Sequence, residues 1–190
     1  MKLDQRIQQI QLILSDVDGV LTDGAITYDN NGIESKTFNV KDGLGIKLWQ
    51  RAGHQFGIIT ARSSHVVKLR MTELGIETIR QGSDNKLSVG LQLVEEFGLQ
   101  PEQVCYVGDD LSDLSLLSAV GLAATVADGV DEVKSIAHIQ TKRTGGHSIW
   151  RYRHSRLRQQ VPDKRCHDRL LHDTSAIGGV LFGRWNIFGV

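Results

Sequence analysis

Short β-rich runs alternate with longer helical patterns through most of this 190-residue chain, and this alternation constrains the fold more than any other feature. Five runs predict strands, at residues 11–15, 55–60, 77–81, 103–108 and 121–126. Five helical patterns follow them, at residues 42–52, 63–74, 85–97, 111–119 and 130–137. Such alternation is typical of a parallel sheet with helices on both faces. We therefore predict a three-layer, Rossmann-like α/β fold, with N-caps at Asp42, Ser63 and Asp110.

One segment interrupts the alternation. Residues 25–38 read as two short strands around the sequence DNNG, whose Asn and Gly residues tolerate the positive φ of a tight turn. The sequence thus predicts a β-hairpin inserted after the first strand. The length of the chain and its 40% apolar content suit one well-buried domain, which we place at residues 1–147.

Residues 148–190 differ in composition from the rest of the chain. Residues 1–147 carry 14 basic and 19 acidic side chains, a net charge of −5, whereas residues 148–190 carry 8 and 3, a net charge of +5. No aromatic platform or helix-turn-helix pattern accompanies these charges, so we expect no nucleic-acid partner. The spacings of the tail's histidines and Cys166 fit no familiar zinc finger. We predict an atypical basic tail, disordered in part or produced by a reading-frame change.

The sequence shows neither the pattern of a membrane span nor that of a signal peptide. No apolar run approaches the roughly 18 residues of a membrane span, and the first residues lack the features of a signal peptide. The two cysteines, Cys105 and Cys166, imply no disulfide framework. We therefore expect a cytoplasmic protein with no membrane partner.

Two aspartates, Asp16 and Asp18, directly follow the first predicted strand. In an open α/β sheet the ligand site lies beyond the carboxyl ends of the strands, so both side chains are predicted to face it. Two neighbouring carboxylates repel, and a hard cation such as Mg²⁺ would compensate. The pair also suits a nucleophile beside an acid/base. A solvated turn remains an alternative, whereas an EF-hand does not fit, because Val20 and Thr27 occupy ligand positions.

Polar residues follow three further predicted strands: Thr60 and Arg62 after the second, Lys86 after the third, and Asp109, Asp110 and Asp113 after the fourth. Each alone has an ordinary structural explanation, as a helix cap or a solvated charge. Together they place hydroxyl, cationic and carboxylate groups at one edge of the sheet.

This order of motifs, D-x-D, Thr, Lys and G-D-D-x-x-D, resembles the haloacid dehalogenase superfamily of phosphatases over about residues 10–142. The resemblance implies that Asp16 attacks phosphorus to form an aspartyl phosphate and that Asp18 acts as acid and base. It also implies Mg²⁺ bound by Asp16, the Asp18 backbone carbonyl and Asp109, with Asp113 as an outer or additional ligand. Thr60 and Lys86 would bind the phosphoryl oxygens.

Longer phrases, among them DVDGVLTDG, FNVKDGLGIKL, ITARSS and TKRTGGH, resemble the 3-deoxy-D-manno-octulosonate 8-phosphate phosphatase family. The resemblance implies a fold without a cap domain and a homotetramer whose hairpins form a central barrel. Arg70 matches an arginine that reaches a neighbouring subunit's site. Phosphatases of 2-keto-3-deoxynononate 9-phosphate resemble this family too but tend to carry an acidic residue where Arg62 stands. Arg62 therefore favours the eight-carbon substrate, since a guanidinium suits the substrate carboxylate.

Two other functions can be weighed against this resemblance. Gly43 and Gly45 lack the third glycine of a dinucleotide fingerprint, where Leu48 stands, so we expect no dinucleotide. A similar fold also forms a non-catalytic oligomerisation module at the end of acylneuraminate cytidylyltransferases. This chain keeps the full motif set, which favours an enzyme that hydrolyses a phosphorylated keto-sugar acid for lipopolysaccharide synthesis.

Overall fold

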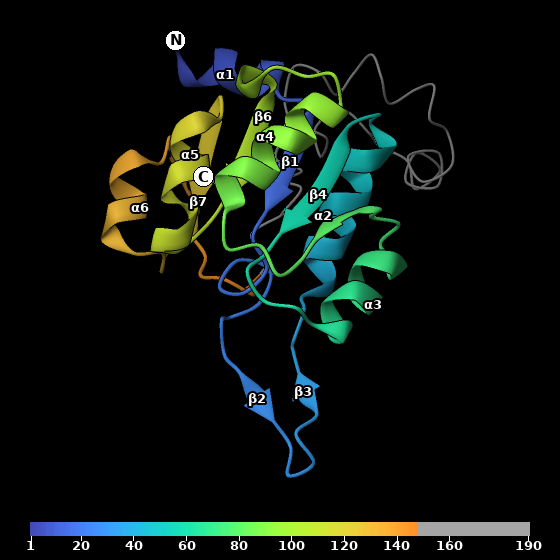
Figure 1. The fold of residues 1–190 in the computed structure, drawn as a ribbon. Coiled ribbons are helices and arrows are strands. Elements are labelled where there is room, and N and C mark those ends of the chain that lie inside the picture. The colour runs from blue at the N-terminus through green and yellow to red at the C-terminus, as the bar shows by residue number, and fades with distance from the viewer. Residues whose placement is uncertain (148–190) are drawn as a thin grey trace, which may run out of the picture.

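The computed structural model describes residues 1–147, which are built around a six-stranded parallel sheet (Figure 1). The strand order is β5-β4-β1-β6-β7-β8. The strands are β1 (Leu12–Ser15), β4 (Gln55–Ile59), β5 (Thr78–Arg80), β6 (Val104–Val107), β7 (Leu122–Thr125) and β8 (Ile139–Gln140). The predicted α/β fold is confirmed, and β8 adds an edge strand that the sequence did not indicate.

Helices cover both faces of the sheet. They are α1 (Leu3–Gln9), α2 (Val40–Arg51), α3 (His65–Glu73), α4 (Lys86–Glu96), α5 (Leu114–Ala119) and α6 (Asp131–Ile136), with 3₁₀ turns η1 (Pro101–Gln103) and η2 (Leu111–Asp113). The three layers follow from the period of two along a strand, which sends successive side chains to opposite faces. In β1, Ile13 joins the core cluster with residues of α2 and α3, whereas Leu12 and Leu14 join the cluster with α4, α5 and α6.

The predicted hairpin is present and projects from the body of the molecule (Figure 1). It consists of β2 (Thr27–Tyr28) and β3 (Glu34–Ser35), which pair antiparallel. The Asp29 side chain closes the turn by accepting hydrogen bonds from the backbone N–H groups of Asn31 and Ile33, both at 2.8 Å. Between β1 and β4 the chain contains only this hairpin and α2, and between β4 and β5 only α3, so no cap domain is inserted there.

Two of the three predicted N-cap residues are wrong, although the observed N-cap lies within three residues of the predicted one in each case. Asp110 caps η2 as predicted. Helix α2, however, begins at Val40, because the Asn39 side chain accepts a hydrogen bond from the Lys41 backbone N–H at 3.0 Å. Asp42 is instead buried within the first turn. Helix α3 has Ser64 at its N-cap position, one residue later than predicted.

Within residues 1–147 no helix is long and apolar enough to cross a bilayer. The predictions for the basic tail and its histidines concern residues 148–190 and lie outside the described residues.

Candidate active site

The candidate site lies where the strand order reverses. β1 pairs with β4 on one side and with β6 on the other, and chains on either side of such a switch point diverge to leave a crevice. Asp16 directly follows β1, and its backbone N–H donates to the Val107 carbonyl at 2.9 Å. Asp109 lies two residues beyond β6. The predicted motifs one and four are therefore brought together at the carboxyl ends of adjacent strands.

Three carboxylates surround one ammonium group at this point. Oxygens of Asp16, Asp109 and Asp113 lie within 4.8 Å of one another. The Nζ of Lys86, in the first turn of α4, lies 2.5 Å from Asp16 Oδ2 and 2.6 Å from Asp113 Oδ1. The Lys86 side chain is only 1% exposed. One cation cannot balance three carboxylates, so the cluster retains an excess of negative charge.

Asp113 holds this cluster together by accepting four hydrogen bonds. Its Oδ1 also accepts a hydrogen bond from the Tyr106 hydroxyl at 2.5 Å. Its Oδ2 accepts from the backbone N–H groups of Asp109 at 3.0 Å and Asp110 at 3.1 Å. Each oxygen thus has two donors, which fixes Lys86 and the loop after β6 in place.

Asp16 and Asp109 carry the unbalanced charge. Burial and the nearby Asp16 and Asp113 raise the pKa of Asp109 to about 8. Burial and repulsion from Asp113 raise the pKa of Asp16 to about 6, against the attraction of Lys86. Asp109 Oδ1 is buried and has no hydrogen-bond partner. Such carboxylates suit a hard divalent cation, because its charge offsets both the cost of burying them and their mutual repulsion.

Gly19 leaves the space that this cluster needs. It has a φ of +84°, and a Cβ there would lie 2.0 Å from Asp109 Oδ2. The last described segment supports the same loop, since the Gly146 backbone N–H donates to the Val20 carbonyl at 3.0 Å. A Cβ at Gly145 would lie 1.8 Å from the Gly19 carbonyl oxygen. The residues present therefore fit a magnesium ion held by Asp16, Asp109 and the chain between Asp16 and Gly19.

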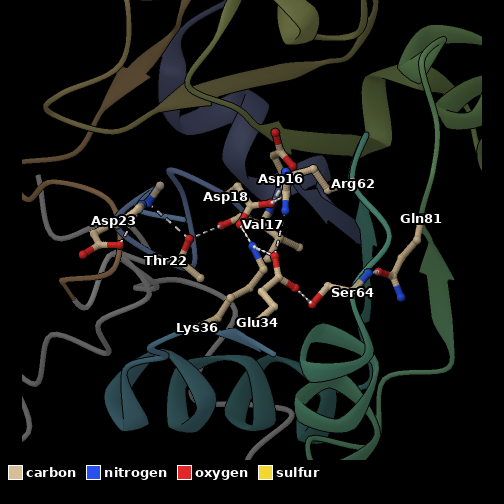
Figure 2. A network of polar contacts seen from close by, with 12 residues as sticks. Asp16, Val17, Asp18, Thr22, Asp23, Glu34, Lys36, Arg62, Ser64 and Gln81 are labelled. Carbon is tan, nitrogen blue, oxygen red and sulfur yellow. Dashed lines mark hydrogen bonds and ion pairs between the residues drawn. The ribbon is translucent and has the colours of Figure 1, made fainter. Parts of the chain in front are cut away.

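Asp18 lies in a second polar network, shown in Figure 2. Its Oδ1 is paired with Lys36, which follows β3 of the hairpin, and its Oδ2 lies 3.7 Å from Arg62 Nε. Arg62 Nη2 donates to Glu34 Oε1 at 2.8 Å, and Ser64 Oγ donates to Glu34 Oε2 at 2.5 Å. The structure thus places the predicted Arg62 beside Asp18, with its guanidinium held by Glu34.

Of the other two predicted site residues, Thr60 lies at the same edge of the sheet as the carboxylates and Arg70 lies elsewhere. Thr60 follows β4 at the same edge of the sheet and is 2% exposed, with its backbone N–H bonded to the Arg80 carbonyl at 2.9 Å. Arg70 does not join the cluster within this chain. It lies on α3, pairs with Glu73 at 3.1 Å and packs against Gly43 of α2.

The sequence did not point to Glu34, Lys36, Ser64 or Tyr106 as site residues. Glu34 and Lys36 are two residues apart in an extended segment, which puts both side chains on one side of the hairpin. That spacing was the available signal, but it does not say which side faces the site. Tyr106 lies in a fully buried strand, where its hydroxyl requires a partner.

Comparison with known proteins identifies the family. A family model for haloacid dehalogenase-like hydrolases matches residues 78–152. The chain is 42% identical, over 141 residues, to the 3-deoxy-D-manno-octulosonate 8-phosphate phosphatase of Escherichia coli K12, covering 74% of this chain and 75% of that protein. The chain belongs to the 3-deoxy-D-manno-octulosonate 8-phosphate phosphatase family. The resemblance of the motifs to this family is confirmed.

Solved structures of 3-deoxy-D-manno-octulosonate 8-phosphate phosphatases agree with this assignment. The Yersinia pestis protein is 40% identical with a TM-score of 0.75, covering 76% of this chain and 78% of that one. The Moraxella catarrhalis protein is 39% identical with a TM-score of 0.74, covering 75% and 82%. The latter was crystallised in complex with a magnesium ion, a phosphate ion and a KDO molecule.

Proposed function

We propose that this chain is a Mg²⁺-dependent phosphatase that hydrolyses 3-deoxy-D-manno-octulosonate 8-phosphate to KDO and inorganic phosphate, in lipopolysaccharide synthesis. The observation that carries the proposal is the buried group of Asp16, Asp109, Asp113 and Lys86 at the switch point of the sheet. Membership of the phosphatase family supports the same reaction and the same substrate.

Asp16 is the proposed nucleophile. Its Oδ1 accepts a hydrogen bond from the Val17 backbone N–H at 2.6 Å and its Oδ2 contacts Lys86, so the carboxylate is held in one orientation. It attacks phosphorus, and the bond from phosphorus to the sugar oxygen breaks as Asp18 donates a proton to that oxygen. Asp18 then takes a proton from the water that attacks the aspartyl phosphate, which releases inorganic phosphate and restores Asp16.

The metal and two polar residues complete the proposed phosphoryl site. Asp16, the Asp18 backbone carbonyl and Asp109 would hold Mg²⁺, which supplies positive charge next to the transferring phosphoryl group. Lys86 and Thr60 bind phosphoryl oxygens. Asp113 is proposed as the outer residue that fixes Lys86 rather than as a direct ligand, because both its oxygens already accept hydrogen bonds.

Arg62 supports a keto-acid substrate. Its side chain is 38% exposed and lies beside Asp18, where a guanidinium can bind the carboxylate of the sugar acid. Hydrogen bonds to Glu34 and Tyr28 raise the pKa of Arg62, which keeps it charged. Arg70 is proposed to act in the site of a neighbouring subunit, since in its own chain it lies against α2. A 2-keto-3-deoxynononate 9-phosphate phosphatase is the alternative within the same chemistry.

The proposed assembly is a homotetramer formed through the hairpin. Its apolar residues Ile26, Tyr28 and Ile33 are 54%, 55% and 62% exposed, and Val40 at the start of α2 is 76% exposed. Apolar side chains gathered on a projecting element are typical of an interface. A cytoplasmic location remains our prediction from the sequence.

Phosphate release from the eight-carbon and nine-carbon substrates, measured side by side with Mg²⁺, tests the proposal. We expect kcat/KM to favour the eight-carbon acid by about tenfold or more, which corresponds to a difference of about 1.4 kcal/mol in transition-state binding. Arg62→Ala should reduce this preference. Arg80→Ala is the matched control, because Arg80 is equally exposed and also pairs with a glutamate, Glu96, at 2.8 Å. A preference for the nine-carbon acid, or loss of preference in the control alone, would contradict the proposal.

A further inference from the structure

The two carboxylate oxygens of Asp18 have different surroundings. Oδ1 is paired with the Lys36 ammonium. Oδ2 is buried and accepts no hydrogen bond, and the Arg62 Nε that faces it lies 3.7 Å away. A buried carboxylate oxygen without a donor is costly, so such atoms need an explanation. One oxygen of Asp18 is thus anchored by an ammonium group, while the other makes no hydrogen bond.

The anchor comes from the hairpin. The Lys36 side chain is 1% exposed, although the residues on either side of it are on the surface. Glu34 Oε1 lies 3.5 Å from Lys36 Nζ, and Glu34 in turn accepts hydrogen bonds from Arg62 and Ser64 of the segment after β4. Figure 2 shows these side chains pointing toward one another and linking the hairpin to the sheet. Lys36 is therefore held by Asp18 after β1 and by Glu34 of the hairpin, which Arg62 and Ser64 fix in turn.

We propose that Lys36 is a positioning residue for Asp18, and that Glu34 holds Lys36 in place. This inference rests on the proposed function, in which Asp18 transfers a proton to and from the reacting oxygens. Proton transfer requires an approach of about 2.6–3.2 Å between heavy atoms, which a freely rotating carboxylate rarely maintains. By pairing with Oδ1, Lys36 fixes the orientation of the whole Asp18 carboxylate, whose Oδ2 makes no hydrogen bond. Lys86 pairs with the nucleophile Asp16 and orients its carboxylate in the same way.

The hairpin therefore has a catalytic consequence besides any role in assembly. It delivers an ammonium group to the acid/base, while the segment after β4 delivers Arg62 and Ser64 to the same glutamate. Displacing the hairpin base would release Asp18 without disturbing Asp16, Lys86 or Asp113, which depend on β1, α4 and η2.

Leaving-group dependence tests this role. Lys36→Met should lower kcat/KM for the sugar phosphate by about 10²-fold, because its alkoxide leaves only when protonated. For p-nitrophenyl phosphate, whose leaving group needs no proton, kcat/KM should change little. Lys36→Arg should recover much of the loss, and Glu34→Gln should show a smaller loss with the same selectivity. The control Lys41→Met alters an exposed lysine of α2 and should leave both substrates unaffected.

The outcomes separate this inference from the proposed function. An equal loss for both substrates would show a merely structural role for Lys36, and no loss would overturn the inference directly. If the wild-type protein hydrolyses aryl phosphates but not the sugar phosphate, the proposed substrate fails. Phenyl and p-nitrophenyl phosphate, whose leaving groups differ in their need for a proton, then decide the role of Lys36. If it hydrolyses no phosphate ester with Mg²⁺, both the function and the inference fall.

Discussion

At the scale of single residues, the site is organised by an imbalance of charge. The carboxylates of Asp16, Asp109 and Asp113 lie close together, and the buried ammonium of Lys86 pairs with Asp16 and Asp113. Each oxygen of Asp113 already accepts two hydrogen bonds. The remaining repulsion therefore falls on Asp16 and Asp109. Their pKa values are raised to about 6 and about 8. This strain is the physical reason why a cation should bind here and stabilise the fold.

The stability of the metal-free protein should consequently fall as pH rises. In the unfolded chain both carboxyls lose their protons near pH 4. The folded state keeps them up to about pH 6 at Asp16 and about pH 8 at Asp109, so between pH 4 and pH 8 the folded state binds more protons than the unfolded state. This contribution is fully present below pH 4 and is lost as pH rises through these values. Thermal unfolding in EDTA across this range measures it.

Asp109→Asn separates this effect from the titration of other groups. In EDTA at pH 8 the variant should unfold at a higher temperature than the wild type, and the difference should vanish near pH 4. Mg²⁺ should raise the midpoint of the wild type and not that of the variant, because ligand binding stabilises only a folded state that retains the site. Equal unfolding midpoints of the wild type and the variant at every pH in EDTA would show that Asp109 does not destabilise the metal-free protein.

The residues predicted from the sequence were those that end strands. Asp16, Thr60 and Asp109 follow β1, β4 and β6, and parallel strands bring such positions to one edge. Glu34 and Lys36 could not be predicted in this way. Their place depends on how the base of the hairpin meets the segments that follow β1 and β4, which is a tertiary arrangement that local spacing does not encode. The packing of Arg70 against Gly43 of α2 is likewise a matter of helix-to-helix geometry.

At the scale of elements, the loop after β1 is as important as the strand. Gly19 combines a positive φ with close approach to Asp109, so it serves both the turn and the proposed metal site. Helix starts show the limits of local signals. Asn39 and Asp42 are both good capping residues, but it is the Asn39 side chain that accepts a hydrogen bond from the Lys41 backbone N–H, while Asp42 is buried in the first turn of α2.

Gly19→Ala should therefore damage metal binding. Its Cβ would lie 2.0 Å from Asp109 Oδ2, so the carboxylate must move away from Asp16. We expect Mg²⁺ affinity to fall by about tenfold or more, a loss comparable to that caused by changes around other metal sites. Isothermal titration with Mg²⁺ measures this.

Gly32→Ala is the matched control for this change. Gly32 also has a positive φ, of +77°, but a Cβ there meets nothing within 4 Å. It should cost roughly 1–2 kcal/mol of backbone strain and leave Mg²⁺ affinity unchanged. Equal effects of the two substitutions on affinity would show that the loop does not act through Asp109.

At the scale of the whole molecule, the projecting hairpin joins two roles. Its base holds Lys36 against Asp18, and its outer residues Tyr28 and Ile33 are exposed and apolar. Only the hairpin and α2 lie between β1 and β4, so we propose that neighbouring copies of the chain supply further cover to the site. Assembly and catalysis are thus expected to be linked through one element.

Ile33→Asp should disrupt the assembly. A charge in an apolar interface is unfavourable, so light scattering after size-exclusion chromatography should show a species smaller than the tetramer that we propose for the wild type. Leu91→Asp is the control, since Leu91 is an exposed leucine, 43% accessible, on α4 away from the hairpin. A wild-type protein that is monomeric at micromolar concentration would exclude the proposed tetramer.

Asp16 and a bound Mg²⁺ are proposed to make this chain a phosphatase. Phosphate release from 3-deoxy-D-manno-octulosonate 8-phosphate by the 190-residue protein, with Mg²⁺ and with EDTA, tests this proposal most directly, with Asp16→Asn assayed beside the wild type. We expect turnover by the wild type with Mg²⁺ and not with EDTA. The loss should be about 10³-fold or more in EDTA and in the variant, the size expected for removal of a nucleophile or an essential metal. Turnover that survives either change would contradict the proposal.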